Sequence, residues 1–397
     1  MRRRFLILLF LFLQAPLRAQ EPDPQYVALT EAVTRLCGQK LTGGNRVEYT
    51  KSGEEYLAWL LEDIAEARES IDMEFYWFDK DSSSAVLTDT LLKKVQEGVR
   101  VRLLMDNLVV PFAPELHYER LRQGGIDIRY VHDFRRMGIL KSFGRIIGLR
   151  DHRKLVVIDN RIVYTGGMNI CDAAIYDWTD MEVRIEGPVA AVLHATMADE
   201  WVASGGEPFD VPLPEANTSY IHVQAFTSKR EASAEALFLE AIGSAKEYFY
   251  AQTPYLSPPE PILDALKEAA GRGVDVRLML PFACDHGFMN ELTRDYFEEL
   301  LEAGIGVSLY GEGYDHSKTF VSDGFLTCIS TINLDKRSFH INQEVGVFIF
   351  DQDVAEEFTK RFLEQEAFCG QPKPGENVRR GIHKPYRAFL RAISPLL

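Results

Sequence analysis

The feature that most constrains this chain is an internal repeat, because two stretches of about 150 residues follow the same order of patterns. LLKKVQEGVRVRLLMDN at 91–107 matches ALKEAAGRGVDVRLMLP at 265–281, and LRQGGIDIRYV at 121–131 matches LLEAGIGVSLY at 300–310. Each of these segments is a helical pattern that stops at a glycine and leads into a strand pattern. Such an order predicts an α/β layered unit in each half.

Two further pairs of segments mark the start and the end of each half. AEARESIDMEFYWF at 65–78 matches IGSAKEYFYAQTPYL at 242–256, and the strand and helix pattern at 182–201 matches that at 344–366. A chain of 397 residues is also longer than one hydrophobic core usually supports. The repeat therefore predicts two lobes of the same fold.

The domain boundaries follow from the repeat and from the composition between its halves. The segment SGGEPFDVPLPEAN at 204–217 is rich in glycine and proline and has no period, which is typical of a linker. We expect a first lobe at 46–203 and a second lobe at 218–370. Residues 20–45 form an N-terminal extension, and residues 371–397 form a C-terminal tail.

The first nineteen residues have the layout of a secretory signal peptide. Arg2, Arg3 and Arg4 precede an unbroken apolar block at 5–13, and a short segment then ends at Ala19. A short uncleaved anchor is the alternative. Either interpretation predicts an exported or membrane-associated protein, in the periplasm or on the outer face of the inner membrane.

Charge and cysteine content exclude several classes of protein. The 44 basic and 59 acidic side chains give a net charge of −15, which is unfavourable for non-specific binding of nucleic acid. No apolar run approaches the roughly 20 residues of a membrane-spanning helix, so a multi-pass membrane protein is excluded. The five cysteines form no C-x-x-C pair and indicate mostly buried thiols. Nothing in the sequence indicates a metal or another cofactor.

The same three-residue constellation occurs once in each half. The spacing H-x-K-x(4)-D is formed by His152, Lys154 and Asp159 in the first half. It recurs in the second half as His316, Lys318 and Asp323.

This spacing favours chemistry at phosphorus. On an extended strand, residues two apart point to the same face, so each histidine and its lysine face one ligand. Lysine supplies positive charge to phosphate oxygens, while one imidazole attacks phosphorus and a second protonates the leaving oxygen. Since each half has one such histidine, the two halves must meet face to face to form one site.

Other polar residues at similar positions of the two halves are expected to support this site. Asn169 and Asn333 follow the motifs, and their amides can donate hydrogen bonds to phosphate oxygens. Glu182 lies 30 residues after His152, and Glu344 lies 28 residues after the second motif histidine. We expect these carboxylates to hold the Nδ1 proton of each imidazole; pairing with a neighbouring base is the alternative.

Asp159 and Asp323 complete the motif, but their role is open. They are candidates for direct chemistry, and structural support at the interface between the halves is the favoured alternative. Tyr76 and Tyr255 end equivalent strand patterns and are candidates to line the cleft.

These motifs resemble those of the phospholipase D superfamily and, within it, the bacterial cardiolipin synthases. The resemblance covers about residues 46–370. HSKTFVSDGFLTCISTINLDKRSFHINQE at 316–344 is similar to the family's second motif, followed by its N-x-D-x-R-S-F and N-x-E signatures, and TPYL at 253–256 is similar to another family segment. The resemblance implies a phosphatidyl group carried on His152, with His316 as the acid and then the base.

We therefore expect two phospholipase D-like α/β/α lobes related by a pseudo-two-fold axis, with one active site between them. The expected function is transfer of a phosphatidyl group between phospholipids such as phosphatidylglycerol, by a monomer that is an internal pseudo-dimer and without a metal or cofactor. A phospholipid hydrolase or a nuclease of the same fold is the alternative enzyme. A non-catalytic lipid-binding protein is the alternative from another class.

The C-terminal tail is basic and amphipathic. Lys373, Arg379, Arg380, Lys384, Arg387 and Arg391 face one acid, Glu376, and apolar residues recur at three- and four-residue steps. This pattern predicts a helix on an anionic membrane surface. Packing of the tail back onto the protein is the alternative.

Overall fold

The computed structural model describes residues 24–38, 41–107, 118–131, 149–213, 221–227, 234–285, 287–372 and 391. The predicted signal peptide or anchor at 1–19 lies outside these residues. So does the predicted tail helix, apart from Arg391. Within the described part of the chain, no helix is both long enough and apolar enough to cross a membrane.

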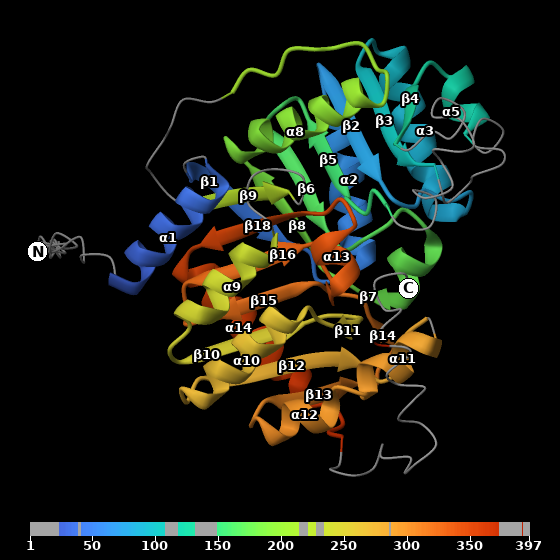
Figure 1. The fold of residues 1–397 in the computed structure, drawn as a ribbon. Helices are drawn as coiled ribbons and strands as arrows, with labels where there is room; N and C mark the ends of the chain where they lie inside the picture. The colour runs from blue at the N-terminus through green and yellow to red at the C-terminus, as the bar shows by residue number, and fades with distance from the viewer. Residues whose placement is uncertain are drawn as a thin grey trace, which may run out of the picture.

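One sheet of fourteen strands runs through the molecule (Figure 1). Its first half contains β1 (Thr42–Tyr49), β2 (Ser70–Phe75), β3 (Arg100–Asp106), β4 (Asp127–Val131), β5 (Leu155–Ile158), β6 (Ile162–Gly166) and β8 (Glu182–Glu186). Its second half contains β9 (Ile221–Thr227), β10 (Tyr248–Gln252), β12 (Asp275–Pro281), β13 (Gly306–Tyr310), β15 (Thr319–Ser322), β16 (Leu326–Ser330) and β18 (Val345–Phe350).

The strand order reads the same from both edges of the sheet. From one edge it is β4-β3-β2-β5-β6-β8-β1, and from the other it is β13-β12-β10-β15-β16-β18-β9. The halves join where β1 and β9 pair antiparallel, with Thr42 opposite Val223 and Asn45 opposite Ile221. An antiparallel junction between equivalent strands is what a two-fold axis produces. The predicted duplication into two α/β lobes is confirmed.

Helices cover both faces of the sheet. The first lobe contains α2 (Gly53–Glu66), α3 (Ser82–Gln96), α5 (Glu119–Gln123), the π-helical turn η1 (Ala173–Asp177) and α8 (Val189–Ala203). The second lobe contains α9 (Ala234–Ser244), α10 (Glu260–Gly271), α11 (Gly287–Arg294), α12 (Phe297–Glu302), α13 (Lys336–His340) and α14 (Gln352–Glu366). On one face, α8 and α14 bury a core that extends across both lobes, whereas the opposite face has a separate core for each lobe.

Local signals explain where these elements begin and end. The glycines that were expected to stop helices do adopt the left-handed conformation, with φ of 91° at Gly98 after α3 and 93° at Gly273 after α10. Asp81 caps the first turn of α3, and Asp351 caps that of α14. The central strands are buried on both faces, as expected of a sheet covered by helices on two sides.

The N-terminal extension is part of the fold, which differs from the predicted boundaries. The expected boundary at residue 46 falls inside β1, which begins at Thr42. Upstream, α1 (Pro24–Cys37) packs on the second lobe, where Leu29 and Val33 join the core that contains Leu237 and Phe350. Since α1 has no counterpart in the repeat, the repeat could not reveal it.

The cysteines and the start of the predicted linker are also placed. All five cysteines are free; Cys171 and Cys328 are buried, and the other three are half-buried. In the linker, Phe209 lies under the guanidinium of Arg102, at 3.2 Å from the ring centroid. The described part of the linker therefore packs against the first lobe.

Candidate active site

The two lobes exchange backbone hydrogen bonds at the motif histidines. The N–H of His152 donates to the carbonyl of Gln343 in the second lobe, at 2.9 Å. At the equivalent place, the N–H of His316 donates to the carbonyl of Thr179 in the first lobe, at 2.7 Å. Two short strands, β7 (Trp178–Thr179) and β14 (Tyr314–Asp315), pair beside the second contact. Each histidine is thus held at the junction of the lobes.

Each imidazole also contacts a carboxylate from the opposite lobe. The Nδ1 atom of His152 lies 2.9 Å from Oε2 of Glu344, and Nδ1 of His316 lies 2.7 Å from Oδ2 of Asp180. The histidine side chains are 14% and 7% exposed, whereas both carboxylates are fully buried. A carboxylate on Nδ1 favours the tautomer that leaves Nε2 for chemistry. The imidazoles are therefore partly exposed, whereas the carboxylates that orient them are fully buried.

The expected pairing of carboxylates with histidines is wrong in two respects. Glu344 serves His152 of the other lobe, not the histidine of its own motif. Glu182 does not contact His152; it is buried and accepts a hydrogen bond from the backbone N–H of Met168, at 3.2 Å. Asp180 is the carboxylate at the second imidazole.

The register of the sheet explains the error. Gly166 pairs with Glu182, and Ser330 at the equivalent position pairs with Gly346. The counterpart of Glu182 is therefore Gly346, and the counterpart of Glu344 is Asp180. Asp180 follows its motif histidine by 28 residues, the same interval that separates Glu344 from His316. Equal spacing was the signal in the sequence that could have identified Asp180.

The two carboxylates differ in their surroundings. Thr331 and Asn342 both donate hydrogen bonds to Glu344. The counterpart of Thr331 is Gly167, where a Cβ atom would lie 2.2 Å from Oδ1 of Asp180, so no side chain fits there. Although burial opposes ionisation of Glu344, His152, Lys154 and the Thr331 hydrogen bond lower its pKa. Burial dominates at Asp180 and raises its pKa to about 6.

Lys154 and Lys318 are buried beside their histidines, as the motif spacing predicts. The Nζ of Lys154 donates to the carbonyl of His152 at 2.7 Å, and Lys318 makes the same contact with His316. Burial lowers the pKa of Lys154 to about 7 and that of Lys318 to about 8. The energetic cost of two buried ammonium groups falls when an anion is bound between them.

Burial and the nearby lysines also favour neutral imidazoles. The pKa of His316 is well below its ordinary value because of burial, followed by the charges of Lys318 and Lys154. The pKa of His152 is lowered mainly by burial, and Glu344 opposes that shift. A neutral imidazole is the form that can attack phosphorus.

Asn169 and Asn333 occupy equivalent buried positions after β6 and β16. Within the described residues, the Oδ1 atom of each has no hydrogen-bond partner. Buried polar atoms of this kind are rare and usually mark a place for a ligand or an ordered water. Both amides therefore retain hydrogen-bonding capacity, as expected of groups that would bind a substrate.

Asp159 and Asp323 bind backbone N–H groups and not the imidazoles, so direct chemistry, one of the two expected roles, does not fit their contacts. Asp159 accepts hydrogen bonds from the backbone N–H groups of 68–70, at 2.8 to 3.0 Å. Asp323 does the same for 246–248, at 2.8 to 2.9 Å. Each aspartate lies in a left-handed turn, with φ of 50° and 49°. They hold the start of β2 and of β10, and Asp323 also accepts a hydrogen bond from Gln25 of α1; none of these contacts joins the two lobes.

Aromatic side chains flank both histidines. The Tyr76 ring packs edge-on against His152, with centroids 5.3 Å apart, and its centroid is 5.5 Å from Nζ of Lys154. Trp178 lies 4.9 Å from the ring of His316. The expectation that Tyr76 lines the cleft agrees with this contact, whereas the sequence patterns did not indicate Trp178.

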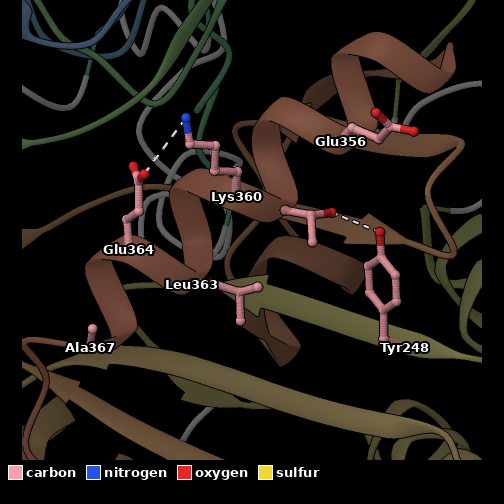
Figure 2. Close-up of a pocket in the computed structure, with 7 residues that line it drawn as sticks. Tyr248, Glu356, Lys360, Leu363, Glu364 and Ala367 are labelled. Carbon is pink, nitrogen blue, oxygen red and sulfur yellow. Dashed lines mark hydrogen bonds and ion pairs between the residues drawn. The ribbon is translucent and has the colours of Figure 1, made fainter.

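Two further findings concern sites elsewhere in the described residues. These residues contain no group of three or more His, Cys, Asp and Glu side chains suited to a metal ion. A surface pocket of about 540 Å³ lies between α14 and β10, lined by Tyr248, Lys360 and Leu363 among others (Figure 2). Neither motif histidine lines this pocket, so it is separate from the candidate site.

Comparison with known proteins agrees with this geometry. The family model described as "Cardiolipin synthase, PLD-like domain" matches residues 60–201 and 238–365. A cardiolipin synthase of Clostridium perfringens (strain SM101 / Type A) is 31% identical over 85% of this chain and 74% of that protein. Cardiolipin synthase A of Erwinia tasmaniensis is 32% identical over 90% of this chain and 76% of that protein.

Two solved structures are similar in fold. Phosphatidylserine synthase from Haemophilus influenzae Rd KW20 has a TM-score of 0.69, with 15% identity over 92% of this chain and 97% of that chain. Polyphosphate kinase from Porphyromonas gingivalis has a TM-score of 0.56, with 16% identity over 81% of this chain and 47% of that chain.

The duplicated sheet and the paired histidine and lysine motifs define an enzyme class with one active site shared by two similar lobes. Together with the matches over both lobes, they show that the chain belongs to the phospholipase D superfamily, in its cardiolipin synthase family. It is a phosphatidyltransferase enzyme of that superfamily.

Proposed function

We propose that this enzyme joins two phosphatidylglycerol molecules into cardiolipin and glycerol through a phosphohistidine. In the first step, Nε2 of His152 attacks phosphorus, and the bond from phosphorus to the headgroup oxygen breaks. The negative charge of the bound phosphodiester offsets the charges of Lys154 and Lys318, so His316 carries a second proton, which it gives to that oxygen as glycerol leaves. In the second step, a hydroxyl of another phosphatidylglycerol returns a proton to His316 and attacks phosphorus, and the bond to His152 breaks.

The observation that carries this proposal is the exchange of carboxylates between the lobes. Glu344 and Asp180 each occupy the Nδ1 side of an imidazole from the opposite lobe, at 2.9 and 2.7 Å. Both Nε2 atoms are then left for one substrate, as attack from one side and protonation on the other require. The relatives named cardiolipin synthases support phosphatidylglycerol as the substrate.

The lysines and asparagines supply the remaining interactions with phosphate. Lys154 and Lys318 place two positive charges beside the histidines, where they stabilise negative charge that develops on the non-bridging oxygens. The Nδ2 groups of Asn169 and Asn333 are the donors that complete the phosphate site. A single chain contains both halves of the site, which supports a monomer as the active unit.

The direct test is incubation of the purified protein with labelled phosphatidylglycerol in detergent micelles, followed by mass spectrometry. Cardiolipin and glycerol in equal amounts are the expected products. Phosphatidic acid as the sole lipid product would show that water is the acceptor and that the enzyme is a hydrolase. Cleavage of a nucleic-acid diester without any change in the lipid would identify a nuclease.

Export or membrane association also belongs to this proposal. The apolar block at 5–13 and the basic residues of the tail at 373–397 support it. Arg391 is the one described residue beyond 372, and it bonds to Asp295 of the second lobe at 2.6 Å. For this residue, the contact favours the alternative that the tail packs back onto the protein.

A further inference from the structure

A cluster of hydroxyl groups and one carboxylate lies beside His316. The hydroxyl of Tyr314 donates to that of Tyr255 at 3.0 Å and lies 3.2 Å from Oδ1 of Asp285. The Tyr255 hydroxyl donates to the same carboxylate oxygen at 2.5 Å. Tyr255 and Tyr314 are half-buried, whereas Asp285 is exposed. The cluster is thus anchored in the second lobe and open to a ligand.

Aromatic rings connect this cluster to the imidazole of His316. Tyr314 lies two residues before His316, and their ring centroids are 5.5 Å apart. Trp178 from the first lobe stands perpendicular to Tyr314, with centroids 5.3 Å apart, and also contacts the imidazole at 4.9 Å. The rings of Tyr314 and Trp178 are perpendicular to each other and both contact His316, and the hydroxyl cluster lies beside them.

The equivalent position beside His152 carries an arginine in place of a tyrosine. Arg150 occupies the position that Tyr314 has in the second lobe, two residues before the motif histidine. Burial and the charge of Asp106 raise the pKa of the Tyr76 phenol, and the positive charges of Arg150 and Arg337 oppose that rise. Two arginines therefore lie near Tyr76 at the His152 end of the site, while the His316 end offers a carboxylate and two phenols. This difference breaks the symmetry of an otherwise repeated site.

We propose that Asp285, Tyr255, Tyr314 and Trp178 form a subsite for a polyol headgroup. The inference rests on the proposed function, in which His316 protonates the glycerol oxygen that leaves phosphorus and then takes the proton of the glycerol hydroxyl that attacks phosphorus. A carboxylate accepts hydrogen bonds from hydroxyl groups, and a phenol both donates and accepts. The Trp178 ring covers the C–H face of the same headgroup.

An ammonium headgroup is the other ligand that a carboxylate and aromatic rings attract. Two observations favour the polyol. The Tyr255 hydroxyl already donates to Asp285, which partly offsets the carboxylate charge, and the lone pairs that remain on Asp285 and the phenols accept hydrogen bonds from the hydroxyls of a polyol. Lys154 and Lys318 also add positive charge to the same site and repel a cation.

The test measures release of labelled headgroup from phosphatidylglycerol, phosphatidylethanol and phosphatidylethanolamine, with propanol present as a common acceptor. Phosphatidylethanol lacks the additional hydroxyls, so the wild-type enzyme should prefer phosphatidylglycerol in kcat/KM by at least about tenfold. In D285N, Y255F and Y314F this ratio should fall towards one. These variants keep the size of each side chain, and thermal unfolding verifies their folding.

Two control variants remove similar groups elsewhere. Y248F deletes a hydroxyl that bonds Thr359 at 2.7 Å, beside the pocket in Figure 2. D264N neutralises a carboxylate that lies 3.3 Å from Lys267 on α10. Both controls should keep the wild-type headgroup preference, because neither residue lies in the cleft.

Three outcomes would count against these ideas in different ways. An unchanged preference in D285N and both phenylalanine variants would overturn the subsite. A wild-type preference for phosphatidylethanolamine that D285N abolishes would identify an ammonium site in its place. Absence of headgroup release from every phospholipid by the wild-type enzyme would reject the proposed function itself.

Discussion

Nδ1 of His316 lies 2.7 Å from Oδ2 of Asp180, although the two residues belong to different lobes. The first lobe delivers this carboxylate from the residues just before β8, beside the backbone contact between Thr179 and His316. Packing of the lobes therefore positions the imidazole directly. Any change in how the lobes meet should alter the chemistry at this histidine.

The motif histidines should both be essential. We expect H152A and H316A each to abolish headgroup release, because one imidazole must attack and the other must transfer the proton. With phosphatidylethanol as the donor, which carries no acceptor hydroxyl, mass spectrometry of peptides should find the phosphatidyl group on His152. H340A is the control, since His340 is exposed and pairs with Glu235. A covalent adduct on His316 alone would reverse the assigned roles.

Loss of the carboxylate at Nδ1 of either histidine should lower kcat more than it raises KM. D180N and E344Q should each lower kcat by about a hundredfold to ten-thousandfold, because an amide no longer favours the reactive tautomer. KM should change little. E182Q is the matched control: burial and Asp180 raise the pKa of Glu182 well above its ordinary value, so glutamine resembles the neutral acid. A loss in E182Q as large as that in D180N would contradict the geometric assignment.

Asp159 and Asp323 should matter for stability. D159A and D323A each remove three hydrogen bonds to backbone N–H groups. We expect a loss of about 1–3 kcal/mol in the free energy of unfolding, measured in urea, with little change in kcat for the folded enzyme. A hundredfold fall in kcat at unchanged stability would restore a catalytic role.

The pH dependence of kcat/KM should be bell-shaped. Protonation of Asp180, whose pKa is raised to about 6 by burial, removes the acceptor of His316 below that pH. Deprotonation of Lys154 and Lys318, with pKa values lowered to about 7 and about 8, removes positive charge from the phosphate site at higher pH. Bound phosphodiester raises the pKa of both lysines, so the alkaline limb of kcat should lie at higher pH than that of kcat/KM. A flat kcat/KM up to pH 9 would contradict this expectation.

Deletion of residues 373–397 separates the two interpretations of the tail. Each basic residue near an anionic membrane contributes about 1 kcal/mol. If the tail binds lipid, the deletion should weaken binding to phosphatidylglycerol vesicles and spare turnover of a soluble short-chain substrate. Equal losses on both substrates would mean that the tail is part of the fold, as the contact between Arg391 and Asp295 favours. D295A tests that single contact without removing the tail.

The sequence was sufficient for the repeated fold because each half contains the same helix stops and strand patterns. Gly98 and Gly273 illustrate this, since both end a helix in the left-handed conformation that their positions in the repeat predict. The same reasoning located His152 and His316, because the motif recurs at equivalent places of the repeat. The expected strand does not include them, since both motifs' histidine and lysine lie just before β5 and β15.

The exchange of carboxylates was not predictable by that reasoning. Local spacing does not specify which lobe's histidine a residue will meet, since this depends on the packing of the lobes. The sequence comparison aligned Glu344 with Glu182, two residues away from its true counterpart. A shift of two residues along a strand leaves every side chain on the same face, so the hydrophobic pattern could not reveal the misalignment. Only the equal interval to the motif histidine distinguishes Asp180.

The contrast between Arg150 and Tyr314 has a consequence for how such an enzyme can evolve. If two separate copies of one half formed this site by pairing, every substitution would be present at both ends of the cleft. Here the copies are consecutive segments of one chain, so a mutation alters one end alone. The chain can therefore retain its shared chemistry while each end becomes selective for a different part of the lipid.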